Sequence, residues 1–422
     1  MAYTPPPAKT EISDTYPNPS NAVARAGFGT LWEYVTGLLG LTGNPAQAQI
    51  ALELEPGVDV QAYSSTLQSY ANGNTLGFKN RIINGAMVID QRNAGASVTG
   101  TASLVYNLDR YASLVNTDGV MTFQRVTDAP TGFTYSLRAT TTTADASLSA
   151  SQRAILLQRI EGFNSADLML GSASAVPFTL SFWVKSTLTG TFGGAFQNND
   201  SDRAYPFTYT ISAANTWEKK TVTITGDTTG TWNTTTGTGL QICWGLGVGS
   251  TFSATAGSWQ AGDFNSATGG TSVIGTLNAT WQVTGVQLEK GSTATSFDYR
   301  PYGTELALCQ RYYYRATGNA SNVFWAGIGY VIDTTRAQGL TFFPVTMRTD
   351  PTALEQSGTA SDYSVLTGVT ATTCTSVPVF NAATNRNLAV TQYTTGATLT
   401  ASQSIALRLA NANSYLGWST EL

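Results

Sequence analysis

The chain has 422 residues, a formal net charge of −4 at pH 7 and no histidine. Charged residues make up 11% of it, well below the roughly 25% of an average soluble protein. Because there is no basic tract, the electrostatic footprint of a nucleic-acid-binding protein is missing, and we expect no nucleic-acid partner. The lack of histidine excludes Ser–His and Cys–His nucleophile arrangements and all imidazole metal ligands.

The length predicts two or three domains, since single cores stop growing beyond about 250–300 residues. No apolar run approaches the ~20 residues that a transmembrane helix needs. The 9 Trp, 19 Tyr and 17 Phe residues argue against disorder. These properties are typical of a mainly β protein with a weakly charged surface.

Three cysteines, Cys243, Cys309 and Cys374, are far apart in the chain. Their odd number and their spacing fit neither a metal site nor a disulfide framework. The first residues lack the features of a signal peptide, so we expect synthesis in a reducing cytosol. We expect no metal, no cofactor and no enzyme activity, although a glycosidase pair among the 26 acidic residues stays open.

The N-terminal region, residues 1–43, predicts an extended arm followed by a helix. Five prolines within residues 1–19 favour extended backbone. Residues 20–39 carry an apolar stripe at helical spacing. A single helix of this length is not stable alone, so it needs a neighbouring domain or copies of itself. Residues 44–79 follow as a connector without a clear period.

Residues 80–300 predict a β-sandwich, because short strands and turn signals repeat along them. The first strand material is broken by a turn at Asn84 and Gly85. Further strands are predicted at residues 111–115, 121–126, 133–138, 178–185, 191–196, 205–212, 219–225, 240–248 and 281–290.

The strand at residues 178–185 alternates sharply. Its apolar residues Phe178, Leu180, Phe182 and Val184 fall on one face, and mostly polar residues fall on the other. This pattern predicts one face packed on a core and the other facing water or a partner. Residues 281–290 are apolar on parts of both faces, as expected of a strand inside a two-layer sandwich.

The stretch from Asn198 to Asp202 supplies several oxygen atoms within five residues, as calcium-binding loops do. It lacks the spacing and the glycine of an EF-hand. A hairpin turn explains it without an ion, and we favour that interpretation.

Residues 301–316 predict a linker helix that Thr304 caps and that runs through Arg315. Leu306, Cys309 and Tyr313 lie along it at helical spacing. The helix either packs against the sandwich or meets two copies of itself on a three-fold axis.

Residues 317–422 predict a separate, smaller β domain. It has no lysine and only nine charged residues. Residues 415–422 predict a final strand that is fixed to the domain, since chain ends are disordered unless they are tied down.

Five segments carry a family resemblance: Phe182-Trp-Val-Lys-Ser186, Thr216-Trp-Glu-Lys-Lys220, the stretch from Ile224 to Trp232, and residues 281–315 and 339–351. They resemble bacteriophage tail fibres and related receptor-binding proteins with a jelly-roll domain of the carbohydrate-binding-module type. The resemblance is strongest over residues 78–316. It implies a mainly β chain with an arm and short helix, a central jelly-roll β-sandwich, a linker helix and a C-terminal β-sandwich tip domain.

The same resemblance implies a homotrimer, assembled in the bacterial cytoplasm, that becomes part of the virion tail. Its N-terminus would dock onto a virion tail protein, and its tip would bind a host surface glycan or another envelope receptor. The candidate anchoring residues are Tyr3, Pro5, Pro6, Pro7, Tyr16 and Trp32. The candidate trimer contacts are Leu306, Cys309 and Tyr313.

Glycan-binding surfaces combine flat aromatic faces with amide and hydroxyl partners, because sugars present both C–H patches and hydroxyl groups. The distal region places aromatic residues on Gly- and Asn-rich segments. The receptor-binding candidates are Trp325, Tyr330, Tyr363, Tyr393, Tyr415 and Trp418.

Other functions stay open. A capsid-attached fibre or decoration protein would share this body and dock elsewhere on the virion, and a tailspike would cleave host polysaccharide. A cellular carbohydrate-binding module or adhesin is less favoured, since export ordinarily requires a signal that the first residues lack.

Overall fold

The structure is a computed structural model that describes residues 79–318, 323–396 and 399–422, with only the backbone described at residues 323–326. These residues fall within one compact unit, Phe78–Leu422. The predicted arm and first helix lie outside the described residues, and so does the connector except for its last residue, Lys79. So do all six anchoring candidates, Tyr3, Pro5, Pro6, Pro7, Tyr16 and Trp32.

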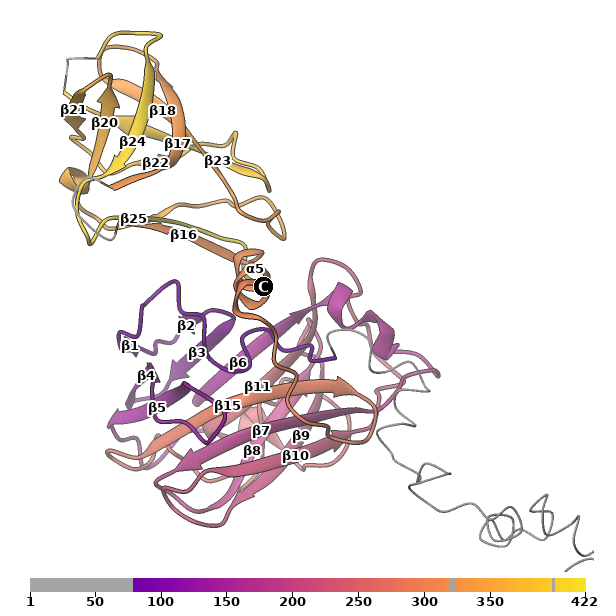
Figure 1. Cartoon of the computed structure of the whole chain (residues 1–422). Coiled ribbons are helices and arrows are strands. Elements are labelled where there is room, and N and C mark those ends of the chain that lie inside the picture. The colour runs from indigo at the N-terminus through magenta and orange to yellow at the C-terminus, as the bar shows by residue number, and fades with distance from the viewer. Residues whose placement is uncertain (1–78, 319–322, 397–398) are drawn as a thin grey trace, which may run out of the picture. The chain divides into compact units, whose positions relative to one another are not determined.

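The central region is a sandwich of two antiparallel sheets (Figure 1). The six-stranded sheet has the order β1 (Val98–Thr99), β4 (Val120–Val126), β5 (Ser136–Thr143), β15 (Thr280–Lys290), β7 (Phe178–Ser186) and β10 (Glu218–Ile224). The seven-stranded sheet has the order β13 (Gln260–Ala261), β9 (Arg203–Ile211), β8 (Gly190–Gln197), β11 (Thr238–Val248), β6 (Arg153–Glu161), β3 (Tyr111–Asn116) and β2 (Val105–Leu108). The predicted jelly-roll β-sandwich is confirmed.

Short elements complete the sandwich. Two brief strands, β12 (Ser253–Ala254) and β14 (Ser266–Ala267), pair in parallel. Three 3₁₀ turns are η1 (Gly162–Asn164), η2 (Ala166–Leu168) and η3 (Ser250–Phe252).

The core between the sheets is built by strand alternation. On β7 the four predicted inward residues, Phe178, Leu180, Phe182 and Val184, are all 0% exposed. The opposite face is partly covered, because Thr179 and Ser181 are also buried while Trp183 and Lys185 are half-buried. The expected contrast between the two faces therefore holds only over the second half of the strand.

Three details of the sandwich differ from the sequence prediction. Residues 79–97 form turns and irregular backbone and no strand, although strand material was expected on both sides of Asn84 and Gly85. Strand β6 was not predicted, because it is buried on both faces and its residues Ala154–Leu157 read as an apolar run without alternation. Strand β5 begins at Ser136, three residues later than expected. Phe133 instead packs in a loop against Phe297 and Tyr299, with ring centroids 5.1 and 5.4 Å away.

The linker helix α5 spans Tyr302–Gln310, and its N-cap is Pro301 rather than Thr304. It ends before Arg315 because Tyr313–Thr317 forms strand β16, which pairs with β25 (Tyr415–Ser419). Within the chain α5 packs against the sandwich. Cys309 on α5 and Tyr312, just after its end, share a buried cluster with Ile83 and Ile89. This is the first of the two arrangements expected for the helix.

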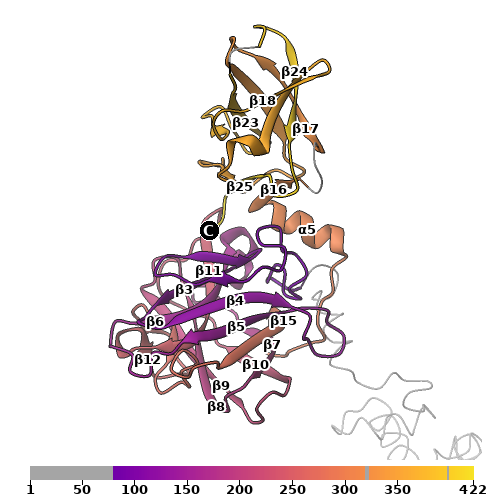
Figure 2. The ribbon, with the colours of Figure 1, turned by 90° about the vertical axis from the view of Figure 1, so that its left-hand side faces the viewer.

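The distal domain consists of two sheets (Figure 2). The three-stranded sheet has the order β16, β25 and β19 (Glu355–Gln356). The seven-stranded sheet has the order β21 (Thr370–Thr373), β20 (Tyr363–Thr367), β24 (Ser404–Leu409), β17 (Val323–Val331), β18 (Arg336–Phe342), β23 (Leu388–Thr394) and β22 (Val379–Phe380). The 3₁₀ turn η4 (Ala360–Asp362) precedes β20. The β structure expected over residues 317–422 is confirmed; it falls within one compact unit with the sandwich, and its first strand already begins at Tyr313.

Candidate functional site

Three of the six receptor-binding candidates are core residues. Tyr363, Tyr393 and Trp418 are each 0% exposed and belong to the buried cluster of the distal domain. Trp418 packs against Tyr314 and Phe343, with ring centroids 6.1 and 5.6 Å away. Their placement corrects the expectation that these rings lie on the surface, because alternation along their strands turns them into the core.

The other three candidates are placed differently. Tyr415 is half-buried, and the Arg315 guanidinium lies over its ring, 3.6 Å from the centroid. Trp325 belongs to β17, and its side chain lies outside the described part of the chain. Tyr330 is 52% exposed, the largest exposed fraction among the candidates whose side chains are described.

Tyr330 lies in a row of polar side chains that crosses four strands of the seven-stranded distal sheet. It is directly opposite Gln338 on β18 and Ser404 on β24, and Gln338 is opposite Gln392 on β23. Residues directly opposite each other in antiparallel strands project from the same face. The Tyr330 hydroxyl donates to Gln338 Oε1 at 2.9 Å, which fixes the ring beside the amide.

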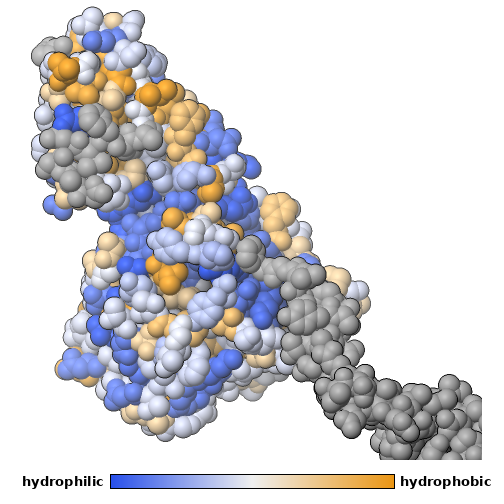
Figure 3. Space-filling model, in the orientation of Figure 1, coloured by the Kyte–Doolittle hydropathy of each residue, from blue (hydrophilic) through white to orange (hydrophobic). Residues whose placement is uncertain are grey.

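An apolar row runs beside the polar row. Ile328, which is 67% exposed, lies opposite Leu340 on β18 and Ala406 on β24. Phe342, two residues after Leu340, is 58% exposed. Figure 3 shows hydrophobic side chains gathered on the visible surface of the distal domain. Solvent-facing positions of an antiparallel sheet are usually polar, so this exposure needs an explanation.

We call the two rows together the distal face, and its residues are Ile328, Tyr330, Gln338, Leu340, Phe342, Gln392, Ser404 and Ala406. None of these side chains carries a charge at neutral pH. The surface offers an aromatic ring, two amides and a hydroxyl beside an apolar strip. These side chains can therefore form hydrogen bonds and apolar contacts with an uncharged ligand. The charge next to them on β18 is Arg336, two residues before Gln338 on the same side of the strand, and it is paired with Asp333.

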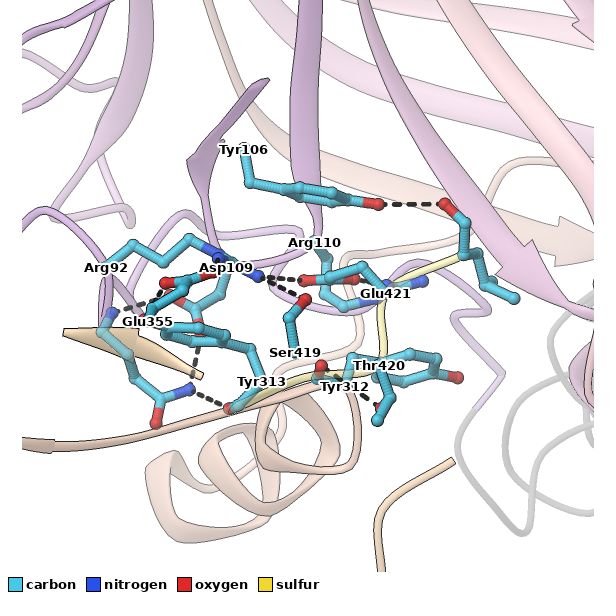
Figure 4. A network of polar contacts seen from close by, with 12 residues as sticks. Arg92, Tyr106, Asp109, Arg110, Tyr312, Tyr313, Glu355, Ser419, Thr420 and Glu421 are labelled. Carbon is cyan, nitrogen blue, oxygen red and sulfur yellow. Dashed lines mark hydrogen bonds and ion pairs between the residues drawn. The ribbon is translucent and has the colours of Figure 1, made fainter. Parts of the chain in front are cut away.

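A second group of residues joins the distal domain to the sandwich (Figure 4). The Arg110 guanidinium forms an ion pair with Glu421, and their side chains are 2% and 5% exposed. Arg92 lies 3.6 Å from the Glu421 carboxylate and 2.9 Å from that of Glu355. Its guanidinium also lies over the Tyr313 ring, 3.5 Å from the centroid.

The residues after β25 are held through their main chain as well. The Leu422 main-chain oxygen accepts hydrogen bonds from the Tyr106 hydroxyl at 3.1 Å and from Arg159 at 2.5 Å. Arg348 donates to the main-chain oxygens of Thr420 and Glu421 at 2.6 and 2.9 Å. We call this group the junction, with the residues Arg92, Tyr106, Asp109, Arg110, Arg159, Tyr312, Tyr313, Arg348, Glu355, Thr420, Glu421 and Leu422.

Burial has electrostatic consequences in the junction. It raises the pKa of the Asp109 carboxyl to about 6, although this group accepts two hydrogen bonds from Gln91. Burial also raises the pKa of Tyr312 above its usual value. Both groups therefore keep their proton, and so stay neutral, up to a higher pH than on a surface. The Arg–Glu pairs carry the charges of the junction.

The trimer-contact candidates are engaged within the chain. Cys309 and Tyr313 are each 0% exposed, and the Tyr313 hydroxyl donates to Glu355 at 2.8 Å. Leu306 is partly buried against the cluster that holds Cys309. Cys309 and Tyr313 thus cannot contact another chain in this conformation, because the expected helix stripe continues into a strand and the sandwich covers it.

The junction was not predicted, although the sequence contains a signal for it. Only nine charged residues fall in residues 317–422. Three of them, Arg348, Glu355 and Glu421, belong to the junction. In a region so poor in charge, the three charged residues that meet the sandwich are a third of the total.

The stretch from Asn198 to Asp202 forms the turn between β8 and β9, as the favoured interpretation proposed. The Asn198 side-chain amide donates to Asp202 Oδ1 at 2.6 Å. Among the residues described, no three His, Cys, Asp or Glu side chains group in a way that would hold a metal ion. The same residues include no helix with the length and apolarity to span a membrane.

Comparisons with known proteins add little about ligands. No family model matches the chain, and no curated protein matches it either. Among solved structures, it is similar to a bacteriophage CBA120 tailspike protein 4 domain (12% identity, 50% of this chain, 21% of that chain, TM-score 0.28). It is also similar to a putative sugar-binding protein from Bacteroides thetaiotaomicron (14% identity, 50% and 99% coverage, TM-score 0.30).

A third similar structure is TmCBM61 in complex with β-1,4-galactotriose (9% identity, 50% and 98% coverage, TM-score 0.24). The chain thus covers about a fifth of the tailspike chain and matches each of the three over about half of its own length. Likenesses this remote say nothing about what this chain binds.

Proposed function

We propose that the chain is a bacteriophage tail fibre that binds an uncharged glycan on the host surface through its distal face. The observation that carries the proposal is the row Ser404, Tyr330, Gln338 and Gln392 beside the exposed Ile328 and Phe342. The sequence resemblance to tail fibres supports the biological setting, and the distal face supports the kind of ligand.

The chemistry of the distal face matches a neutral sugar. The Tyr330 ring offers a flat surface for the C–H patch of a pyranose. Gln338 and Gln392 provide amide donors and acceptors at fixed positions, which suit hydroxyl groups. Because the eight residues of the distal face are uncharged and the neighbouring Arg336 is paired with Asp333, the surface would discriminate little between ligands by their charge.

An open surface of this kind binds weakly as a single site. A homotrimer would carry three such surfaces, and several fibres on one particle would multiply the effective concentration. The proposal therefore includes trimerisation and attachment of residues 1–43 to a virion tail protein, both of which rest on the family resemblance. It involves adhesion and no chemical reaction.

The proposal is tested with the full chain, labelled and applied to an array of neutral and acidic glycans. Tyr330→Ala should lower binding to the recognised neutral glycans by about tenfold or more, as for other aromatic anchors. Tyr302→Ala is a matched control, since Tyr302 is 63% exposed but lies on α5. Equal binding by both variants would contradict the assignment of the distal face.

A second candidate function of the distal face is contact between copies of the chain. The exposure of Ile328 and Phe342 favours it, because apolar residues at the centre of a sheet face commonly become buried in assemblies. Under this alternative, Ile328→Ser would lower the oligomeric state measured by light scattering. The glycan proposal instead predicts that the oligomeric state of this variant stays unchanged.

A further inference from the structure

The loop that follows β15 folds back over the end of that strand and brings a hydroxyl, a carboxylate and a carboxamide together. These groups belong to Thr295 in the loop and to Glu289 and Gln287 on β15. We propose that Thr295 and Gln287 become joined by an intramolecular ester cross-link. It forms with release of ammonia, and Glu289 acts as the base.

The strand and the loop fix the positions of the three groups. Gln287 and Glu289 are two residues apart, so they project from the same face of β15. The Thr295 hydroxyl donates to Glu289 Oε2 at 2.7 Å. Gln287 Nε2 donates to Glu289 Oε1 at 2.9 Å and lies 3.5 Å from Thr295 Oγ1. One carboxylate therefore contacts both the attacking hydroxyl and the leaving nitrogen.

The carboxamide of Gln287 is oriented by its partners. Its Oε1 accepts a hydrogen bond from the Asp298 main-chain N–H at 2.8 Å, and its Nε2 donates to the Ser296 main-chain oxygen at 3.2 Å. Because a donor meets Oε1 and acceptors meet Nε2, the two ends of the amide are not interchangeable. The Asp298 N–H also lies where negative charge develops on Oε1 during attack, and main-chain donors stabilise such an oxyanion.

The surroundings favour attack by the hydroxyl over hydrolysis. Gln287 is 0% and Glu289 is 4% exposed, so water has little access to the amide or to the ester that replaces it. Lys79 Nζ donates to Thr295 Oγ1 at 2.5 Å, and a cation there stabilises charge on the oxygen as its proton leaves. A threonine hydroxyl is a weak nucleophile, and an adjacent base activates it.

The reaction balances without a co-reactant. Glu289 takes the proton of the Thr295 hydroxyl while Oγ1 forms a bond to Cδ of Gln287. The Cδ–Nε2 bond then breaks, and the nitrogen leaves as ammonia with the proton that Glu289 returns. The products are one ester and one ammonia, so the chain becomes lighter by about 17 Da.

The cross-link secures the loop that holds the first described residues of the sandwich. Asp298, in the same loop, accepts hydrogen bonds from the main-chain N–H groups of Lys79 and Asn80 at 3.0 and 3.3 Å. A covalent bond from this loop to β15 keeps that contact closed when the chain is under tension.

Mass spectrometry of a tryptic digest of the full chain tests the proposal. Trypsin cleaves after Lys290, between the two residues that the ester joins. The peptides on either side should stay together, with a mass about 17 Da below their sum. Hydroxylamine cleaves esters and spares amides, so it should separate them. Two separate peptides of unchanged mass in the untreated wild-type digest would overturn the proposal.

Two variants identify the reacting groups. Thr295→Val keeps the side-chain shape and removes the nucleophile, and Glu289→Gln removes the base, so both should yield separate peptides. Thr293→Val is the matched control, since Thr293 is an exposed threonine of the same loop, and its peptides should stay joined. Joined peptides in Thr295→Val, or joined wild-type peptides that resist hydroxylamine, would contradict an ester at Thr295. The wild-type digest can refute the cross-link by itself, whether or not the variants fold.

Discussion

The distal domain is polar and closed where it meets the sandwich, and apolar and open on its seven-stranded sheet. At the junction, Arg110 and Glu421 are almost fully buried and paired. On the distal face, Ile328, Tyr330 and Phe342 are each more than half exposed. The junction is thus built around buried charged residues, whereas the eight residues of the distal face are uncharged.

The contrast also separates two kinds of interaction energy. A buried ion pair gives little net stability, because desolvation offsets the attraction, but breaking it is costly and so the pair enforces one arrangement. Exposed apolar side chains contribute almost nothing to the stability of the single chain and become valuable only on binding. The predictions below test this division.

The largest effect is expected for Glu421→Ala. This change leaves the Arg110 guanidinium, 2% exposed, without its carboxylate partner. The free energy of unfolding should fall by about 3–5 kcal/mol, as measured by urea denaturation. Asp350→Asn is the control, since the Arg386–Asp350 pair is 52% and 62% exposed and should contribute less than about 1 kcal/mol. Similar losses in both variants would show that the junction is not a special site.

Trp418→Ala and Tyr330→Ala should have opposite consequences. Trp418 is fully buried, so its truncation should cost about 3–5 kcal/mol of stability. Tyr330 is half exposed, and its truncation should change stability by no more than about 0.5 kcal/mol while it abolishes most binding. Thermal unfolding of both variants beside wild type measures the difference. A marked destabilisation by Tyr330→Ala would mean that this ring has a structural role.

Asp109→Asn should change how stability depends on pH. Burial raises the pKa of Asp109 to about 6 in the folded chain, against about 4 in the unfolded chain. Between these values the folded state binds more protons, so the contribution of this group to stability falls as pH rises from about 4 to about 6. The variant should lack this part of the slope in urea titrations across the interval. The same slope in both proteins would contradict the shifted pKa.

The smallest effect is expected for Ile328→Ser. Because Ile328 is 67% exposed, the free energy of unfolding should stay within about 0.5 kcal/mol of wild type. Binding to immobilised glycan should weaken several-fold, since the apolar strip lies beside the polar row. If Ile328→Ser binds glycan as well as wild type does, the ligand contacts the polar row and not the apolar strip.

Much of the sandwich follows from its sequence, because alternation on β7 and β11 and the turns between them are strong local signals. Strand β6 escaped prediction since both of its faces are covered, which no local pattern reports. The predicted helix extended beyond the end of α5, because Tyr313 fits the spacing of a helical stripe. In the structure Tyr313 instead belongs to β16, which pairs with β25 at the far end of the chain. Long-range pairing decided that case.

The candidate site was only partly predictable. Which aromatic residues face outward depends on strand register, and a shift of one residue exchanges the two faces. The irregular pairing of β17 between Phe324 and Ile328 shows why the register could not be read from spacing alone. Tyr330 was named as a candidate because it is an aromatic residue in a Gly- and Asn-rich segment. Gln338, Gln392 and Ser404 come from three other strands and meet it only in the folded sheet.

Hydrogen–deuterium exchange of the full chain, with and without a saturating neutral glycan from the array, tests the central claim most directly. Amide protection should increase in residues 327–342, which hold β18 and the last five residues of β17, and should stay unchanged at the junction strands β16 and β25. Protection confined to β16 and β25, or no change in residues 327–342, would contradict receptor binding by the distal face.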